Sequence, residues 1–190
     1  KMNKIVAIVG MAGSGKSIAS SYFEENGYNL VYFGGVIYEK MKEENIEITP
    51  ESQKEYREKI RKEHGMGVVA KLLLPKIKKL YQEGNVILDG LYSWDEYKIL
   101  KEEFKDLVVI AIVCDKKLRY DRISKRKERA FNEKEIIARD VAEIENSAKG
   151  GPIAYADYYI LNNSGMEQYL KDLTRIKSLI EGVDENEEDD

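Results

Sequence analysis

A glycine-rich segment near the start of the chain constrains the fold more than any other feature. Residues 10–17 read Gly-Met-Ala-Gly-Ser-Gly-Lys-Ser and fit the pattern G-x-x-x-x-G-K-[ST] in full. The segment follows an apolar run at residues 5–9, which is typical of a buried parallel strand, and precedes a helix-like pattern that ends at Gly27. A loop in this setting cradles phosphates with its backbone N–H groups. The sequence therefore predicts a P-loop that binds a nucleoside triphosphate.

The positions of this loop have distinct expected roles. Glycine permits backbone dihedrals and a close approach of phosphate that a Cβ would block. The helix that begins near Lys16 adds the partial positive charge of its N-terminus. We expect the Lys16 ammonium to reach the β- and γ-phosphates and the Ser17 hydroxyl to bind Mg²⁺. The expected nucleotide-binding residues are Gly10, Ala12, Gly13, Ser14, Gly15, Lys16 and Ser17.

A second ligand for Mg²⁺ is expected at the end of another strand. Residues 86–88 form an apolar strand-like run, and Asp89 and Gly90 follow it. A carboxylate at this point fits the second metal ligand of P-loop proteins, and Gly90 lets a substrate approach the backbone. An aspartate that only ends a strand is the alternative. Asp89 could also act as the base for an acceptor hydroxyl.

Strand-like and helix-like segments alternate along the rest of the chain. This alternation predicts a three-layer α/β fold with a parallel sheet. We expect the most apolar run, residues 107–113, at the centre of the sheet, a kink at Pro75 and a mobile loop at residues 149–152. The expected strands are residues 5–9, 28–33, 86–88, 107–113 and 158–161, and the expected helices are 17–26, 36–44, 51–63, 68–80, 94–104, 115–129, 133–148 and 166–180.

Length, charge and cysteine content indicate one domain in a reducing compartment. The chain has 190 residues, a formal net charge of −4 and one cysteine, Cys114, in an apolar run where we expect it to be buried. We expect one domain over residues 1–182 and a disordered acidic tail over 183–190. The longest apolar run is too short to span a membrane, and strand-like residues begin at once. These features lead us to expect a cytoplasmic protein without a signal peptide.

Size and missing motifs narrow the class of P-loop protein. A GTPase would carry an N-K-x-D motif that reads guanine, and the sequence has none. Motor and AAA-type ATPases are larger and usually form rings, so compact kinases with a mobile lid are the class that we expect. Such lids close arginines over the phosphates and stabilise the charge of the transferring group.

A basic segment supplies candidates for a lid over residues 115–148. Arg122 and Arg126 are four residues apart, which predicts one shared helix face, and Arg129 and Arg139 follow them. Arginine suits this role because it stays charged and binds phosphate oxygens in a bidentate way. The alternative is a solvated helix face with surface ion pairs.

Together these motifs resemble those of adenylate-kinase-related, dephospho-CoA-kinase-like P-loop kinases. The matching segments are residues 10–17, 89–91, 121–126 and 156–162, within a similarity that covers nearly all of residues 3–180. The resemblance implies a nucleoside-monophosphate-kinase-like fold and phosphoryl transfer with ATP and Mg²⁺. It implies that Arg122 stacks on adenine, and that Arg126 and Arg139 contact the phosphates. It also implies that the backbone at Asn162 lines the adenine pocket.

Two departures from the family pattern fall at the expected acceptor site, around the helical segment 36–81. Members of that family carry arginines where this chain has Tyr38 and Tyr92. A phenol has no charge, so a monophosphate would lose binding energy there. Arg57 and Arg61, four residues apart, could replace those arginines. Otherwise the acceptor is not a simple monophosphate, and the two tyrosines stack on a base or sugar; core packing is the alternative for both.

Two functions stay open at this point. The first is a kinase that transfers the γ-phosphoryl group of ATP to a small nucleotide-like acceptor, either a nucleoside monophosphate or the ribose hydroxyl of a dephospho-CoA-like molecule. The second is a regulatory protein that binds or slowly hydrolyses ATP. RNA binding by the basic segment is a weaker third, because no aromatic residues interleave the cations. We expect no membrane partner, and a monomer or small homo-oligomer.

Overall fold

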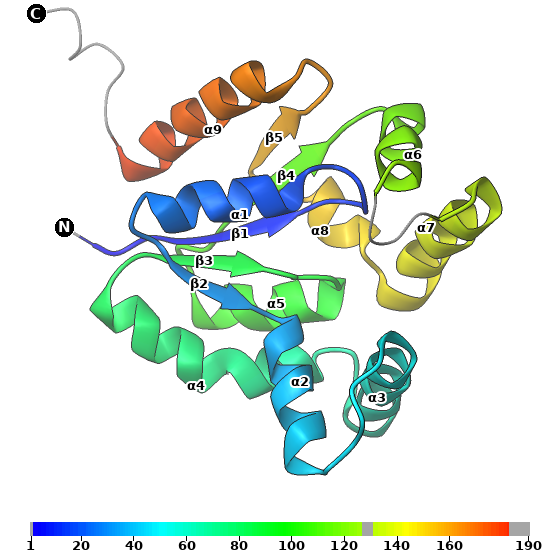
Figure 1. The fold of residues 1–190 in the computed structure, drawn as a ribbon. Coiled ribbons are helices and arrows are strands. Elements are labelled where there is room, and N and C mark those ends of the chain that lie inside the picture. Colours follow the sequence, from blue (N-terminus) through cyan, green and yellow to red (C-terminus); the bar gives the residue numbers. More distant parts are fainter. Residues whose placement is uncertain (1, 127–130, 183–190) are drawn as a thin grey trace, which may run out of the picture.

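A parallel sheet forms the middle layer of the fold. The computed structural model describes residues 2–126 and 131–182; the expected acidic tail and Arg129 lie outside them. Within these residues one sheet has the strand order β2-β3-β1-β4-β5, and each neighbouring pair is parallel. Figure 1 shows the strands side by side between two layers of helices. The strands are β1 (Ile5–Val9), β2 (Asn29–Tyr32), β3 (Val86–Asp89), β4 (Val108–Val113) and β5 (Tyr158–Leu161).

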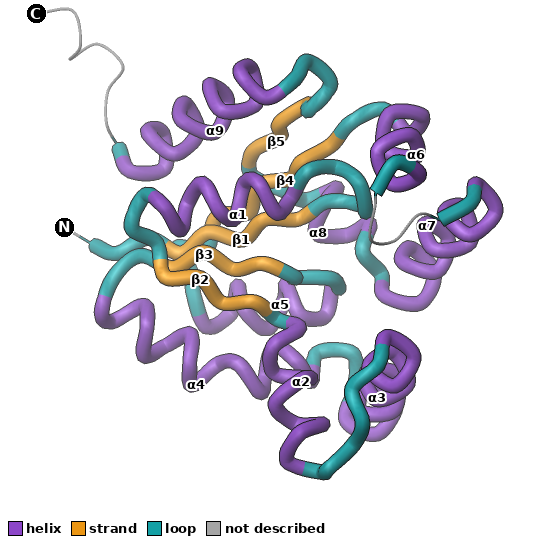
Figure 2. Tube along the Cα trace, in the orientation of Figure 1, coloured by secondary structure: helices purple, strands orange, loops and turns teal. Residues whose placement is uncertain are grey.

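Helices cover both faces of this sheet. The even residues of β1 pack with α1 and α9, and its odd residues pack with the layer that contains α2 to α5. Figure 2 shows the resulting sandwich of helices around strands. The helices are α1 (Lys16–Glu25), α2 (Gly34–Glu43), α3 (Pro50–His64), α4 (Val68–Glu83), α5 (Trp94–Glu103), α6 (Lys116–Ser124), α7 (Glu133–Ser147), α8 (Gly150–Ala154) and α9 (Met166–Glu181). The expected three-layer α/β P-loop fold is confirmed.

The centre of the sheet is β1, and the expectation that residues 107–113 lie there is wrong. All five residues of β1 are buried, and the strand pairs with β3 on one side and β4 on the other. High hydrophobicity marks any strand that is covered on both faces, so it does not distinguish the middle strand from its neighbour. The helix α4 runs through Pro75 as one element.

Two other expectations about local structure are corrected. The helix expected over 115–129 ends at Ser124, so Arg126 lies beyond α6 and does not share a helix face with Arg122. On a longer helix Arg122 and Arg126 would be four residues apart, and like charges at that spacing destabilise a helix. The loop expected at 149–152 is the start of α8, where a Cβ on Gly151 would lie 2.9 Å from the Trp94 ring. Close packing explains this glycine.

No helix among the described residues is both long and apolar enough to cross a membrane.

Candidate functional site

The glycine-rich loop joins the carboxyl end of β1 to the start of α1. Gly13 and Gly15 have φ angles of 80° and 101°, in the left-handed region that favours glycine. A Cβ on Gly10 would lie 2.5 Å from the Ile112 carbonyl oxygen, so this glycine is required by the close approach of β4. No side chain caps the N-terminus of α1. The loop therefore has the backbone freedom and the open helix end that phosphate binding requires.

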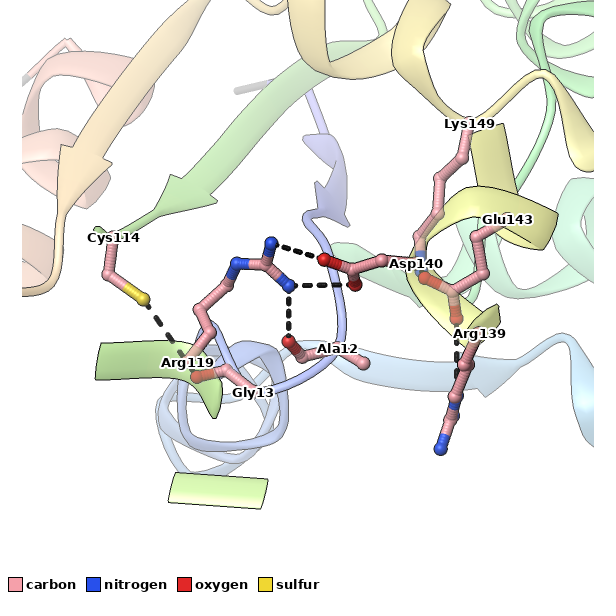
Figure 3. Close-up of polar contacts among 8 residues, drawn as sticks. All are labelled: Ala12, Gly13, Cys114, Arg119, Arg139, Asp140, Glu143 and Lys149. Atoms are coloured by element: carbon pink, nitrogen blue, oxygen red, sulfur yellow. Dashed lines mark hydrogen bonds and ion pairs between the residues drawn. The ribbon is translucent and has the colours of Figure 1, made fainter. Parts of the chain in front are cut away.

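Arg119 ties this loop to α7. One guanidinium nitrogen donates to the Ala12 carbonyl at 3.0 Å and to Asp140 Oδ1 at 2.9 Å, and the other donates to Asp140 Oδ2 at 2.6 Å. Both side chains are buried, and Figure 3 shows the paired geometry. Because a buried ion needs its partner, this bidentate pair joins α6 and α7 to the loop. Sequence reasoning missed Arg119 because nothing distinguishes it from the other cations of its helix.

Asn162, just after β5, and Tyr169 of α9 hold the other side of the loop. Asn162 Nδ2 donates to the Ser14 carbonyl at 2.9 Å, and the Tyr169 hydroxyl donates to the Gly15 carbonyl at 2.7 Å. Arg122 donates to the Asn162 carbonyl at 2.8 Å. Arg122 and Asn162 thus lie together against the loop. The Cys114 thiol, expected in the core, is only half-buried here, because β4 ends one residue before it.

Two lysine ammonium groups lie over one tyrosine ring beside the loop. The Nζ atoms of Lys16 and Lys149 are 5.5 Å and 5.0 Å from the Tyr92 ring centroid. Lys149 is 1% exposed, and its ammonium lies 3.1 Å from Glu143 Oε2. Burial, and then repulsion by Lys149, lowers the pKa of Lys16 to about 7. Sequence reasoning missed Lys149, because its segment has the composition of a loop.

Asp89 lies at the same edge of the sheet as the loop. It ends β3 opposite Ile8 of the neighbouring β1, and its side chain is half-buried. Burial raises the pKa of Asp89, and the nearby Ser20 hydroxyl, Lys16 and Lys149 oppose that effect. Ser17 is exposed in the first turn of α1. A hydroxyl and a carboxylate at one edge are oxygen donors of the kind that Mg²⁺ takes. Among the described residues no three His, Cys, Asp or Glu side chains form a metal cluster of their own.

A buried ion pair, Arg61 with Glu96, connects α3 to α5. Arg61 Nη2 lies 3.8 Å from Glu96 Oε1, and the two side chains are 11% and 0% exposed. Burial raises the pKa of Glu96 to about 7, against the effect of Arg61. Arg61 Nε and Glu96 Oε2 are buried without a hydrogen-bond partner among the described residues. This pair is therefore an incomplete polar network, with capacity for one more group.

The residues expected at the acceptor site differ in exposure and in surroundings. Burial raises the pKa of Tyr92, and the positive charge of Arg57 opposes this effect. Tyr38 is 48% exposed on α2, which excludes core packing for this side chain. Gly90 has a φ of 103°, a turn that favours glycine after β3. A cavity of about 500 Å³ between α2, α3 and α4 is lined by none of these four residues.

The expected lid arginines differ in their surroundings. Arg126 is exposed just after α6. Arg139 Nε lies 3.5 Å from Glu143 Oε1, and its guanidinium lies 5.7 Å from the Phe131 ring centroid. Through Glu143, Arg139 is linked to Lys149 and so to the edge that carries Lys16.

Sequence comparison identifies the family of the chain. A family model described as an AAA domain matches residues 6–145, although size led us to expect a compact kinase rather than an AAA-type ATPase. A UPF0200 protein of Pyrococcus furiosus is 36% identical over 182 residues, which cover 93% of this chain and 97% of the relative. A UPF0200 protein of Sulfurisphaera tokodaii is 36% identical over 171 residues, which cover 87% and 91%.

Solved structures agree with this fold. A shikimate kinase of Bacteroides thetaiotaomicron matches with a TM-score of 0.60 at 12% identity, over 94% of this chain and 98% of that one. A gluconokinase of Sinorhizobium meliloti matches with a TM-score of 0.57 at 14% identity, over 96% and 97%. At such identities the likeness shows the P-loop kinase fold. Residues 6–145 match the AAA-domain model, and the chain has a P-loop kinase fold. The chain belongs to the UPF0200 protein family.

Proposed function

We propose that this protein is an ATP-dependent phosphotransferase that moves the γ-phosphoryl group of ATP to a small nucleotide-like acceptor. One observation supports this proposal most strongly. The glycine loop with Lys16, the carboxylate of Asp89 and the cations around Tyr92 meet at one edge of the sheet. Phosphoryl transfer requires fixed positive charge around the transferring group and little covalent chemistry from the protein. This edge offers that charge.

The loop and α1 would bind the triphosphate. The left-handed glycines and the uncapped helix end leave backbone N–H groups for phosphate oxygens. Lys16 would bind the β- and γ-phosphates, and a nearby anion would restore the protonated form of this buried amine. Arg122 and Asn162, joined by a hydrogen bond, would lie on the adenine side.

Mg²⁺ fits the oxygen donors at this edge. Ser17 and Asp89 would hold it, and the phosphates would supply further ligands. When bound, the ion would neutralise charge that develops on the phosphate oxygens. For a hydroxyl acceptor a base is also needed, and Asp89 is a half-buried carboxylate at this edge.

The acceptor would bind near Tyr92. Arg57 and Arg61 of α3 would supply positive charge to an anionic group of the acceptor. Tyr92 would contact the acceptor beside Gly90, while the exposed Tyr38 is available to stack on a base or sugar. The dephospho-CoA-kinase-like resemblance and the small-molecule kinases among the structural neighbours support a small acceptor.

The lid segment would complete the site. Arg126, which is exposed just after α6, would contact a bound nucleotide, and Arg139 would act from α7. Closure of such a segment excludes water and limits hydrolysis of ATP.

ADP release from Mg-ATP tests the function. The panel would contain ribo- and deoxynucleoside monophosphates, dephospho-CoA and a sample without acceptor. A large rise in rate with one acceptor is the expected result and would identify it. A slow rate that no acceptor changes would favour the second candidate, a regulatory ATPase, which the tyrosines at positions 38 and 92 support.

A further inference from the structure

Lys149 is a buried cation that the backbone turns toward the nucleotide-binding edge. It follows Ala148, whose left-handed conformation, with φ at 50°, ends α7 and reverses the chain before α8. The Lys149 side chain is 2% exposed. Burial of an ammonium group costs several kcal/mol unless a carboxylate or another anion accompanies it. Its placement therefore requires an electrostatic explanation.

The anion beside Lys149 is shared between two cations. Glu143 Oε2 lies 3.1 Å from the Lys149 ammonium, and Glu143 Oε1 lies 3.5 Å from Arg139 Nε. Figure 3 shows the Glu143 carboxylate between these two cations. One carboxylate thus faces two positive groups, and the Lys16 ammonium lies over the same Tyr92 ring as the Lys149 ammonium.

This arrangement leaves positive charge for a further anion. A divalent cation held by Asp89 and Ser17 would neutralise the Asp89 carboxylate, which would leave Glu143 as the counter-ion of the lysines. Two ammonium groups over one ring repel each other. A polyphosphate between them would offset that repulsion.

We propose that Lys149 is a second phosphate-binding lysine, which acts with Lys16 on the terminal phosphate of the bound nucleotide. Glu143 is the counter-ion that holds Lys149 in place before the nucleotide binds. The terminal phosphate is the target because the Lys149 ammonium lies over the same Tyr92 ring as the ammonium of Lys16, the lysine expected at the β- and γ-phosphates. Lys149 thus lies beside both the loop lysine and Tyr92, an expected acceptor residue. This inference rests on the proposed function only in assuming that the loop binds ATP.

The test compares binding of ATP with binding of ADP, because only ATP carries the terminal phosphate. Isothermal titration calorimetry with Mg²⁺ and no acceptor would measure both affinities for the full chain and for two variants. In Lys149→Met we expect ATP affinity to fall about tenfold or more, as for the loss of one charge-assisted contact, and ADP affinity to change less than about twofold. In Lys149→Arg, which keeps the charge, we expect the ratio of the two affinities to stay within about threefold of the original.

Each outcome decides between the alternatives. An unchanged affinity ratio in Lys149→Met, or an equal loss of both affinities, would overturn the proposal and make Lys149 structural. Thermal unfolding without nucleotide identifies a variant that fails to fold; Lys149→Gln then replaces Lys149→Met in the comparison. If the original chain binds neither nucleotide, the proposed function fails together with this inference. If ATP discrimination is lost in Lys149→Met but no acceptor supports turnover, the lysine assignment stands and the kinase assignment fails.

Discussion

Replacement of Asp140 by alanine tests whether the buried pair with Arg119 holds the loop in place. The change removes both carboxylate hydrogen bonds, at 2.9 and 2.6 Å, and leaves a guanidinium that is buried beside the Ala12 carbonyl. Removal of one partner of a buried pair costs about 3–5 kcal/mol of unfolding free energy. For a domain of this size that loss lowers the melting temperature by about 6–20 °C.

A double variant distinguishes the cost of leaving a buried charge unpaired from the cost of lost packing. In Arg119→Met with Asp140→Leu no buried charge is left alone, so the main loss is the hydrogen bond to Ala12, worth about 1 kcal/mol. We therefore expect the double variant to be more stable than Asp140→Ala. Urea-induced unfolding at constant pH would measure all three proteins.

An exposed ion pair supplies the control for this experiment. Lys40 and Glu43 are 3.2 Å apart, with side chains that are 39% and 65% exposed. Solvent screening limits such a pair to less than about 1 kcal/mol, so Lys40→Met should be nearly neutral. A loss in Asp140→Ala no larger than that of Lys40→Met would refute the reasoning that the Arg119 pair is buried and structural.

Four further predictions concern the loop and the Arg61–Glu96 pair. Lys16→Ala should abolish turnover with an unchanged circular dichroism spectrum; full activity would contradict the mechanism. The free Lys16 amine has a pKa of about 7, and bound phosphate would raise that pKa. ATP affinity should therefore fall by up to about tenfold per pH unit above 7. Calorimetry with Lys16→Ala should show no such pH dependence of ATP affinity. Glu96 has a pKa raised from 4.5 to about 7, so its contribution to the free energy of unfolding should fall as pH rises from 4.5 to 7. Urea unfolding of Glu96→Gln should show no such loss of stability with pH. Gly15→Ala should destabilise the chain by about 1–3 kcal/mol, because φ is 101° and the new Cβ would lie 2.6 Å from Asn162 Nδ2; a neutral result in urea would refute this.

The loop and the fold class could be predicted because their signals are local. Residues 5–27 contain the strand, the loop and the helix in one continuous stretch, and glycine at positions 13 and 15 reports a backbone conformation directly. Asp89 could be placed at the same edge because parallel strands end together. The strands at 86–89 and 158–161 were likewise visible as short apolar runs.

Other expectations were wrong because contacts distant in sequence decided them. The composition of residues 149–152 predicts a loop, but packing of Gly151 against Trp94 makes the segment a helix. The central place of β1 depends on which strands pair, and hydrophobicity alone does not carry that information.

What the sequence by itself determined is the P-loop, the parallel α/β fold and the candidate nucleotide-binding residues. Only the tertiary structure decided which charged side chains pair with one another: Arg119 with Asp140, Lys149 with Glu143, and Arg61 with Glu96. A charged residue in an isolated helix pattern is most simply read as solvated, because its partner comes from another element. Burial and pairing arise when the chain brings those elements into contact, and the chemistry of this site depends on them.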